Sequence, residues 1–168
     1  MIQDEIAEFR ALHAAVAKRS WLSPSDAERY EVLADRLWDR VLAVRKGAIT
    51  KKYDRSRQGI RSRRAVRVDL TWTAAVHRAI TVDIGTGGFA ALVAAAPPRS
   101  TAVLAKLHLD GGEITVMARV AAARERGGTA RVSFAFTDVP TAERLRLQRF
   151  ILNDALADVS LDASQHAS

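Results

Sequence analysis

Apolar residues recur every three or four positions along the first third of the chain, which is the period of an amphipathic helix. One helix is predicted over residues 3–19 and a second from Pro24 to residue 46. Ser23 is a good N-cap for the second helix, and Pro24 suits its first turn. The short connection predicts a helical hairpin. The apolar positions of the two helices are Ile6, Phe9, Leu12 and Val16, then Tyr30, Leu33, Ala34, Leu37, Trp38, Val41 and Val44.

From Val66 onward the apolar period changes to two, which is typical of half-buried strands. Glycine-rich turns at residues 110–112 and 126–128 separate the later strands and favour hairpins. Six short strands at regular spacing indicate an antiparallel barrel, because closure removes exposed sheet edges. A last helix is predicted to begin at Pro140. The predicted strands cover residues 66–72, 76–82, 89–93, 101–109, 113–122 and 129–136.

The predicted fold class is therefore α+β, mainly β. It is a six-stranded antiparallel β-barrel with a C-terminal helix, preceded by an N-terminal α-helical hairpin. Three regions follow: the hairpin over residues 1–47, a linker over residues 48–62 and the barrel with its helix over residues 63–160. The linker has no clean period and is rich in Lys, Arg and Ser.

Composition narrows the class of protein. Hydrophobic residues form 48% of the 168-residue chain, which is enough for a packed core. There is no cysteine, and no apolar run approaches the roughly 20 residues of a membrane span. We therefore expect a cytoplasmic protein without a membrane segment.

The net charge of +7 is unevenly placed. Ten Lys or Arg residues lie between Arg45 and Arg67, against Asp54 within that segment and Asp69 just beyond it. Such a segment attracts polyanions, although a solvated linker would look the same.

The sequence does not favour an enzyme. The four histidines lie apart without metal-ligand spacing, and no nucleophile elbow, zinc-protease motif or phosphate-binding P-loop occurs. We predict no catalytic residue, no metal and no cofactor.

A binding site finds better support, around Arg63, Arg67 and a turn that begins at Asp83. Arginine binds phosphate in a bidentate manner and can also bond the acceptor edge of guanine, whereas Asp83 can accept from guanine N–H groups. Gly85, Gly87 and Gly88 permit positive φ and close approach of a base to the backbone. Separately, the arginines could be a solvated linker and the glycines a tight turn. Together they suit a planar, doubly phosphorylated, guanine-bearing ligand.

Residues from about 61 to 155 resemble a PilZ domain, the bacterial receptor module for the second messenger cyclic di-GMP. The family motif R-x-x-x-R matches residues 63–67, and the motif D/N-x-S-x-x-G matches residues 83–88 except at Gly85. The family's late strand and helix have counterparts at residues 132–136 and 147–151. A second register with the same arginine spacing, residues 57–61, also exists; the first is preferred because Val68-Asp69-Leu70 follows it as the family's first strand does.

The resemblance implies roles for individual residues. Arg63 and Arg67 would hold phosphate and guanine, and Arg64 would assist them. Asp83 would bond a guanine, and Gly88 would keep the turn open. Gly85 replaces the family's serine, and loss of one neutral hydrogen bond costs on the order of 1 kcal/mol, or several-fold in affinity.

Three functional hypotheses follow. The first is a non-enzymatic cyclic di-GMP receptor, in which the nucleotide orders the Arg-rich linker and changes the interdomain arrangement or partner binding. The second is a PilZ-fold protein-interaction module that no longer binds nucleotide, which Gly85 supports. The third is a nucleic-acid-binding protein that uses the basic segment 45–67. A protein partner, or a second copy of the chain, is expected on the N-terminal hairpin.

Overall fold

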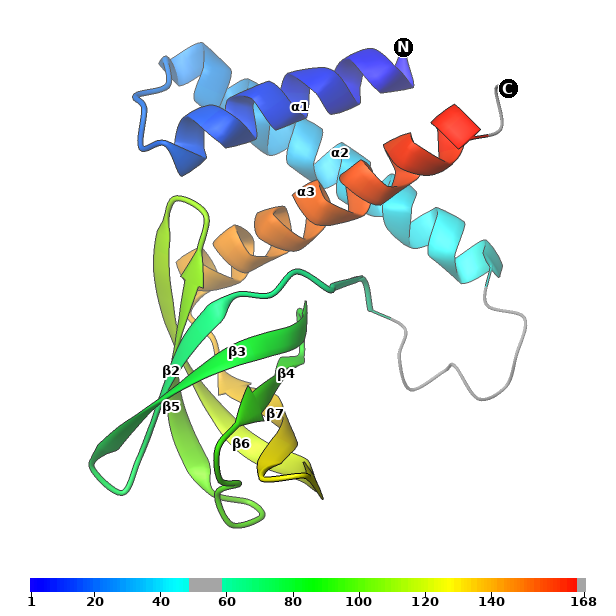
Figure 1. Cartoon of the computed structure of the whole chain (residues 1–168). Coiled ribbons are helices and arrows are strands. Elements are labelled where there is room, and N and C mark those ends of the chain that lie inside the picture. Colours follow the sequence, from blue (N-terminus) through cyan, green and yellow to red (C-terminus); the bar gives the residue numbers. More distant parts are fainter. Residues whose placement is uncertain (49–58, 166–168) are drawn as a thin grey trace. The chain divides into compact units, whose positions relative to one another are not determined.

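The computed structural model describes residues 1–48 and 59–165, so most of the predicted linker lies outside the described residues (Figure 1). The chain divides into two compact units. One comprises Met1–Ile60 with Arg149–Ser168, and the other comprises Arg61–Gln148. The predicted boundaries at residues 47/48 and 62/63 stay predictions.

The helices and strands follow the predicted order, with one short extra strand at the start of the barrel. The predicted α+β class and the six-stranded barrel with its flanking helices are confirmed. The elements are α1 (Ile2–Ala17), α2 (Pro24–Ala48), β1 (Arg61–Ser62), β2 (Arg67–Trp72), β3 (Ala75–Gly85), β4 (Gly88–Val93), β5 (Ala102–Leu109), β6 (Gly112–Arg126), β7 (Thr129–Asp138) and α3 (Thr141–Gln165).

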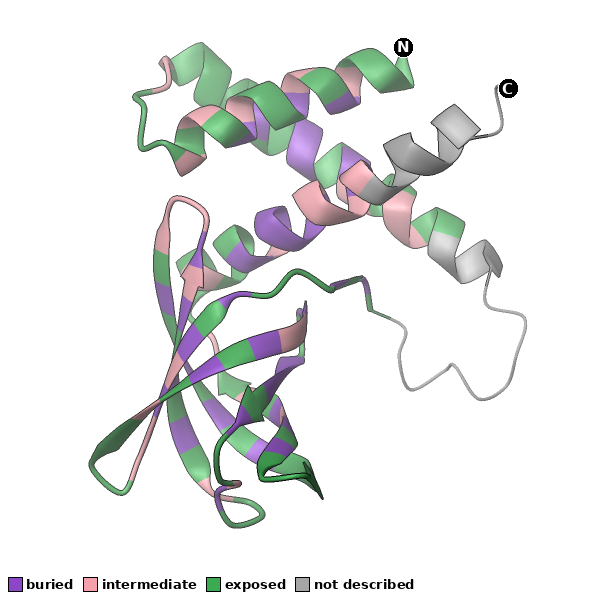
Figure 2. Cartoon of the chain, viewed as in Figure 1, coloured by how far each residue is buried: buried purple, intermediate pink, exposed green. Residues whose placement is uncertain are grey.

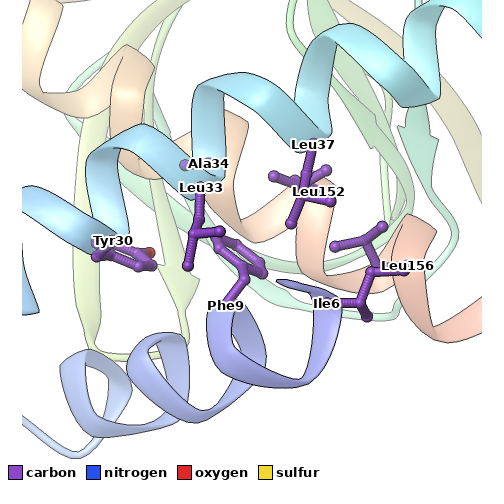
Figure 3. Packing of buried hydrophobic residues seen from close by; sticks show 8 residues of the cluster. All are labelled: Ile6, Phe9, Tyr30, Leu33, Ala34, Leu37, Leu152 and Leu156. Carbon is purple, nitrogen blue, oxygen red and sulfur yellow. The ribbon is translucent and has the colours of Figure 1, made fainter. Parts of the chain in front are cut away.

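The helical unit is held together by one apolar cluster from α1, α2 and the middle turns of α3 (Figure 3). Leu152 and Leu156 of α3 complete a cluster that the two helices of the hairpin do not close alone. The Ser23 hydroxyl accepts from the Asp26 amide at 3.1 Å, which confirms the predicted N-cap of α2. The cluster contains Ile6, Phe9, Tyr30, Leu33, Ala34, Leu37, Leu152 and Leu156.

Tyr30 is the polar group at the centre of the helical unit. Its hydroxyl lies 2.8 Å from His13 Nδ1, its ring stacks on Phe9 at 5.5 Å, and the Arg149 guanidinium lies 5.4 Å from its centroid. Burial raises the pKa of Tyr30 to about 12, so the phenol stays protonated and able to donate. Glu31 pairs with Arg149, which supplies the counter-charge that this largely buried arginine needs.

The barrel unit is a closed antiparallel sheet. The strand order is β1-β3-β2-β5-β6-β7-β4, and a further pairing of β3 with β4 closes the ring of six long strands. Buried and exposed residues alternate along these strands, as the period of two predicts (Figure 2). The interior is filled by aliphatic side chains and by Phe89, which stacks on Phe134 at 4.8 Å.

The two predicted hairpin turns are present. Gly111 and Gly112 join β5 to β6, and Gly127 and Gly128 join β6 to β7, all four with positive φ. None of the helices among the described residues has the length and hydropathy of a membrane-spanning segment.

Candidate ligand-binding site

A β-bulge in β3 determines where the Asp83 side chain points. The pairing of β3 with β4 runs from Ile80–Leu92 through Thr81–Ala91 to Asp83–Ala90, so Val82 is the additional residue. Strict alternation from exposed Ile80 would place Asp83 inside the barrel. The bulge shifts the phase, so Ile84 is fully buried and Asp83 faces the outside.

The Asp83 carboxylate accepts from two arginines on different strands. Arg61 of β1 donates through Nε at 3.0 Å and through Nη2, both to Oδ1. Arg131 of β7 donates through Nη2 to Oδ2 at 3.3 Å. The Asp83 side chain is 20% exposed, whereas the two arginines are 39% and 53% exposed, so this ion-pair cluster is open to solvent on one side.

Gly85 leaves room for the Arg61 side chain. Arg61 is paired with Gly85 in the β1–β3 ladder. A Cβ at residue 85 would lie 3.2 Å from Arg61 Nη1 and 3.4 Å from Arg61 Cγ, so a serine here would crowd the arginine. A guanidinium thus lies across the position that a serine side chain occupies in the family motif.

Gly88 is required for packing rather than for an unusual backbone conformation. It pairs with Ala135 of β7, and a Cβ at residue 88 would lie 2.1 Å from the Phe134 carbonyl oxygen. Glycine permits positive φ, but Gly85, Gly87 and Gly88 do not adopt it in the structure. The bulge and the close approach of β4 to β7 shape this turn instead.

The segment that carries the predicted arginine motif is fixed to β3 by the buried Thr81. The Val66 amide donates to Thr81 Oγ1 at 2.9 Å, and the Thr81 amide donates to the Val66 carbonyl at 2.9 Å. Thr81 therefore holds the backbone between Arg64 and Val66 in place.

The arginine side chains of this segment differ in their partners. Arg64 forms two parallel hydrogen bonds to Asp110, at 2.5 and 2.7 Å. Among the described residues, exposed Arg63 has no ion pair.

Arg67 lies on the outer face of β2 beside a histidine and a carboxylate. Its Nη2 lies 3.0 Å from His108 Nε2 and 3.8 Å from Asp69 Oδ2. His108 in turn lies 2.8 Å from Asp69 and 3.2 Å from Glu113. The hydrogen bond from His108, with the nearby Arg67 charge, holds the pKa of Asp69 below its ordinary value.

This arrangement predicts an acid sensitivity that depends on Asp69. Because the folded pKa of Asp69 is depressed, its contribution to stability is present above the unfolded pKa of about 3.9 and is lost as pH falls through the folded pKa. Asp69→Asn should therefore flatten the dependence of unfolding free energy on pH below about 5. Urea denaturation of both proteins between pH 7 and pH 2.5 checks this. Parallel curves would contradict the assignment.

The structure brings together only part of the predicted site. Asp83, Gly85 and Gly88 lie on one turn, but the carboxylate contacts Arg61 and Arg131 rather than Arg63 or Arg67. Arg64 and Arg67 pair with acids and a histidine on neighbouring strands.

Arg61 and Arg131 contact Asp83 but were not among the predicted site residues. Arg61 carried a weak signal through the alternative arginine register, whereas Arg131 had none, because strand pairing alone places it beside Asp83.

The comparisons with known proteins agree with this architecture. The sequence model of the PilZ domain family matches residues 55–153, more than half of the chain. The chain therefore belongs to the PilZ domain family, whose members are generally non-catalytic cyclic di-GMP receptors.

Two solved proteins share the fold at low identity. The inhibitor of motility MotI/DgrA of Bacillus subtilis is 14% identical with a TM-score of 0.55, over 60% of this chain and 51% of that one. YcgR of Escherichia coli in complex with c-di-GMP is 21% identical with a TM-score of 0.53, over 66% of this chain and 50% of that one.

The PilZ domain of YcgR alone, with c-di-GMP, is 20% identical with a TM-score of 0.51, over 64% of this chain and 95% of that domain. The chain thus spans about half the length of MotI/DgrA and of full YcgR. None of the curated proteins matches it significantly.

Proposed function

We propose that this chain is a non-enzymatic, cytoplasmic receptor for cyclic di-GMP. The site comprises Arg63, Arg64, Arg67, Asp83, Gly85 and Gly88, to which we add Arg61. Family membership supports the ligand class, and two of the solved relatives, YcgR and its isolated PilZ domain, contain c-di-GMP.

One observation carries the proposal: the bulge in β3 presents Asp83 on the same outer face as Arg67. A carboxylate there can accept hydrogen bonds from two N–H groups of a guanine, while guanidinium groups bind phosphate. A bulge that turns an acidic side chain out of the barrel costs a regular ladder pairing, and such bulges are common beside functional sites.

Ligand binding requires an exchange of partners at Asp83. Oδ1 accepts two bonds from Arg61, so both of its lone pairs are used. A guanine that donates to both carboxylate oxygens therefore displaces at least one Arg61 bond. The freed guanidinium remains beside the ligand and can bind its phosphate, in the role that the absent serine hydroxyl does not fill.

The position of these residues in the chain suggests how binding is transmitted. The first segment of the helical unit ends at Ile60 and the barrel unit begins at Arg61, so the proposed arginines directly follow this boundary in the sequence. We infer that the nucleotide, held by these arginines, changes the interdomain arrangement or the binding of a partner to the helical unit.

Isothermal titration of the purified chain with cyclic di-GMP tests the proposal. We expect saturable binding at or below tens of micromolar and a rise in melting temperature with ligand concentration. GMP at equal concentration is the control, because it carries one base and one phosphate and should bind much more weakly. Heat changes no larger than those of dilution, together with an unaltered melting temperature, would reject the receptor hypothesis. The hypothesis of a protein-interaction module that binds no nucleotide would then be favoured.

A further inference from the structure

Four outward-facing residues form a continuous row across the barrel beside Asp83. Arg67 of β2 pairs with Ile80 of β3, Ile80 pairs with Leu92 of β4, and Leu92 pairs with Arg131 of β7. The row therefore reads arginine, isoleucine, leucine, arginine across four adjacent strands. No sequence motif joins these residues.

The two central side chains form an apolar surface that water still reaches. Ile80 is 48% exposed and Leu92 is 49% exposed. Single exposed aliphatic residues are ordinary, but these two are direct cross-strand neighbours with an arginine on either side. With strands roughly 4.8 Å apart, the two arginine backbones are separated by about 14 Å along the row.

Both arginines are held near the row but remain accessible. The Arg67 side chain is 55% exposed and lies against His108 and Asp69 at one end. The Arg131 side chain is 53% exposed and lies 3.3 Å from Asp83 at the other end. Each cation thus has a carboxylate that orients it and an open side toward solvent.

We propose that this row is a second part of the ligand site, in which Ile80 and Leu92 form the floor under a purine ring and Arg131 binds a phosphate or the guanine acceptor edge. The inference rests on the proposed function and adds three residues to it. A planar heteroaromatic ring with anionic groups on both sides fits a flat aliphatic surface between two guanidinium groups. Arg131 would then orient Asp83 when the site is empty and bind the ligand when it is occupied.

Three substitutions test the row by titration with cyclic di-GMP. Arg131→Gln should lower affinity about tenfold to a hundredfold and weaken its dependence on salt, because a charge-assisted bond is lost. Leu92→Thr and Ile80→Thr should each lower affinity about fivefold with the salt dependence unchanged, because only apolar contact is lost. Threonine is β-branched, which strands favour, so neither substitution opposes the strand conformation.

Matched controls come from β5 and β6, the two long strands that the row does not cross. Leu104 of β5 is also an exposed aliphatic residue, 42% exposed, and it pairs with exposed Met117 of β6. Leu104→Thr and Arg119→Gln should leave affinity within about twofold, and circular dichroism should show every variant folded.

The outcomes separate the two proposals. If the unaltered chain binds and the three row variants bind equally well, the row is not part of the ligand site and the receptor function stands. If the unaltered chain does not bind, the receptor function fails and the row fails with it. Loss of affinity in both Leu104→Thr and the row variants would show a general effect on the barrel and would also overturn the row.

Discussion

Gly88→Ala should lower the free energy of unfolding of the barrel unit by about 3 kcal/mol and its melting temperature by roughly 12 to 24 °C. The added Cβ would lie 2.1 Å from the Phe134 carbonyl oxygen and 3.2 Å from Ala135 Cα. Both are backbone atoms of β7, so no side-chain rotation relieves the collision. The β4–β7 ladder would have to separate, and with it the closure of the barrel.

Gly87→Ala is the matched control for this prediction. A Cβ at residue 87 would meet nothing within 4 Å, and neither glycine has a positive φ. We expect a change of stability within about 0.5 kcal/mol at residue 87, as for other exposed positions without special contacts. Thermal melting of the three proteins in parallel gives the comparison. Equal melting temperatures for the two variants would show that the strands adjust freely at Gly88.

The comparison of Gly88 with Gly87 gives the last glycine of the motif at residues 83–88 a structural role. In a sequence, a glycine shortly after an acidic residue predicts a flexible turn. In the folded chain, Gly88 begins β4 directly after the turn from β3, and the β7 backbone lies so close that a Cβ at residue 88 has no room. A substitution that removes ligand binding at this residue would therefore act through the barrel rather than through a lost ligand contact.

The regular part of the fold could be predicted because it follows from local periodicity. Alternation determined which faces of β2 and β5 are buried, and the glycine pairs determined two hairpins. The Ser23 cap could also be predicted, because it depends on residues within one turn.

The details of the site could not be predicted in the same way. The phase change at the bulge leaves no mark in the run Val82-Asp83-Ile84, which is compatible with either face. Arg61 and Arg131 lie 22 and 48 residues from Asp83 in sequence and reach it only through strand pairing. Likewise, the packing of Leu152 and Leu156 with α1 and α2 joins the two ends of the chain. Long-range contacts of this kind are not contained in local spacing.

Arg67→Ala should reduce the affinity for cyclic di-GMP at least about a hundredfold. In the proposed complex this guanidinium makes two charge-assisted bonds, each worth about 1.5 to 3 kcal/mol. Arg67→Lys should fall between, about tenfold weaker than the unaltered chain, because lysine keeps the charge but loses the bidentate fork. The folded state should tolerate both changes, since the Arg67 side chain is 55% exposed and its contacts with His108 and Asp69 lie at the surface.

The measurement is isothermal titration, with Arg119→Ala as the control because it removes the same charge from an exposed strand position on β6. Equal losses in Arg67→Ala and Arg119→Ala would indicate attraction by net charge alone and would contradict a specific contact. A large loss confined to Arg67→Ala, with an intermediate loss in Arg67→Lys, would support a bidentate contact.

The surroundings of Arg67 in the free protein also favour binding. The Asp69 carboxylate, 3.8 Å from Arg67 Nη2, attracts the guanidinium to the outer face of β2, where the row through Ile80 and Leu92 begins. Binding would begin from an arginine that is already oriented, and less conformational entropy would be lost than from a free side chain.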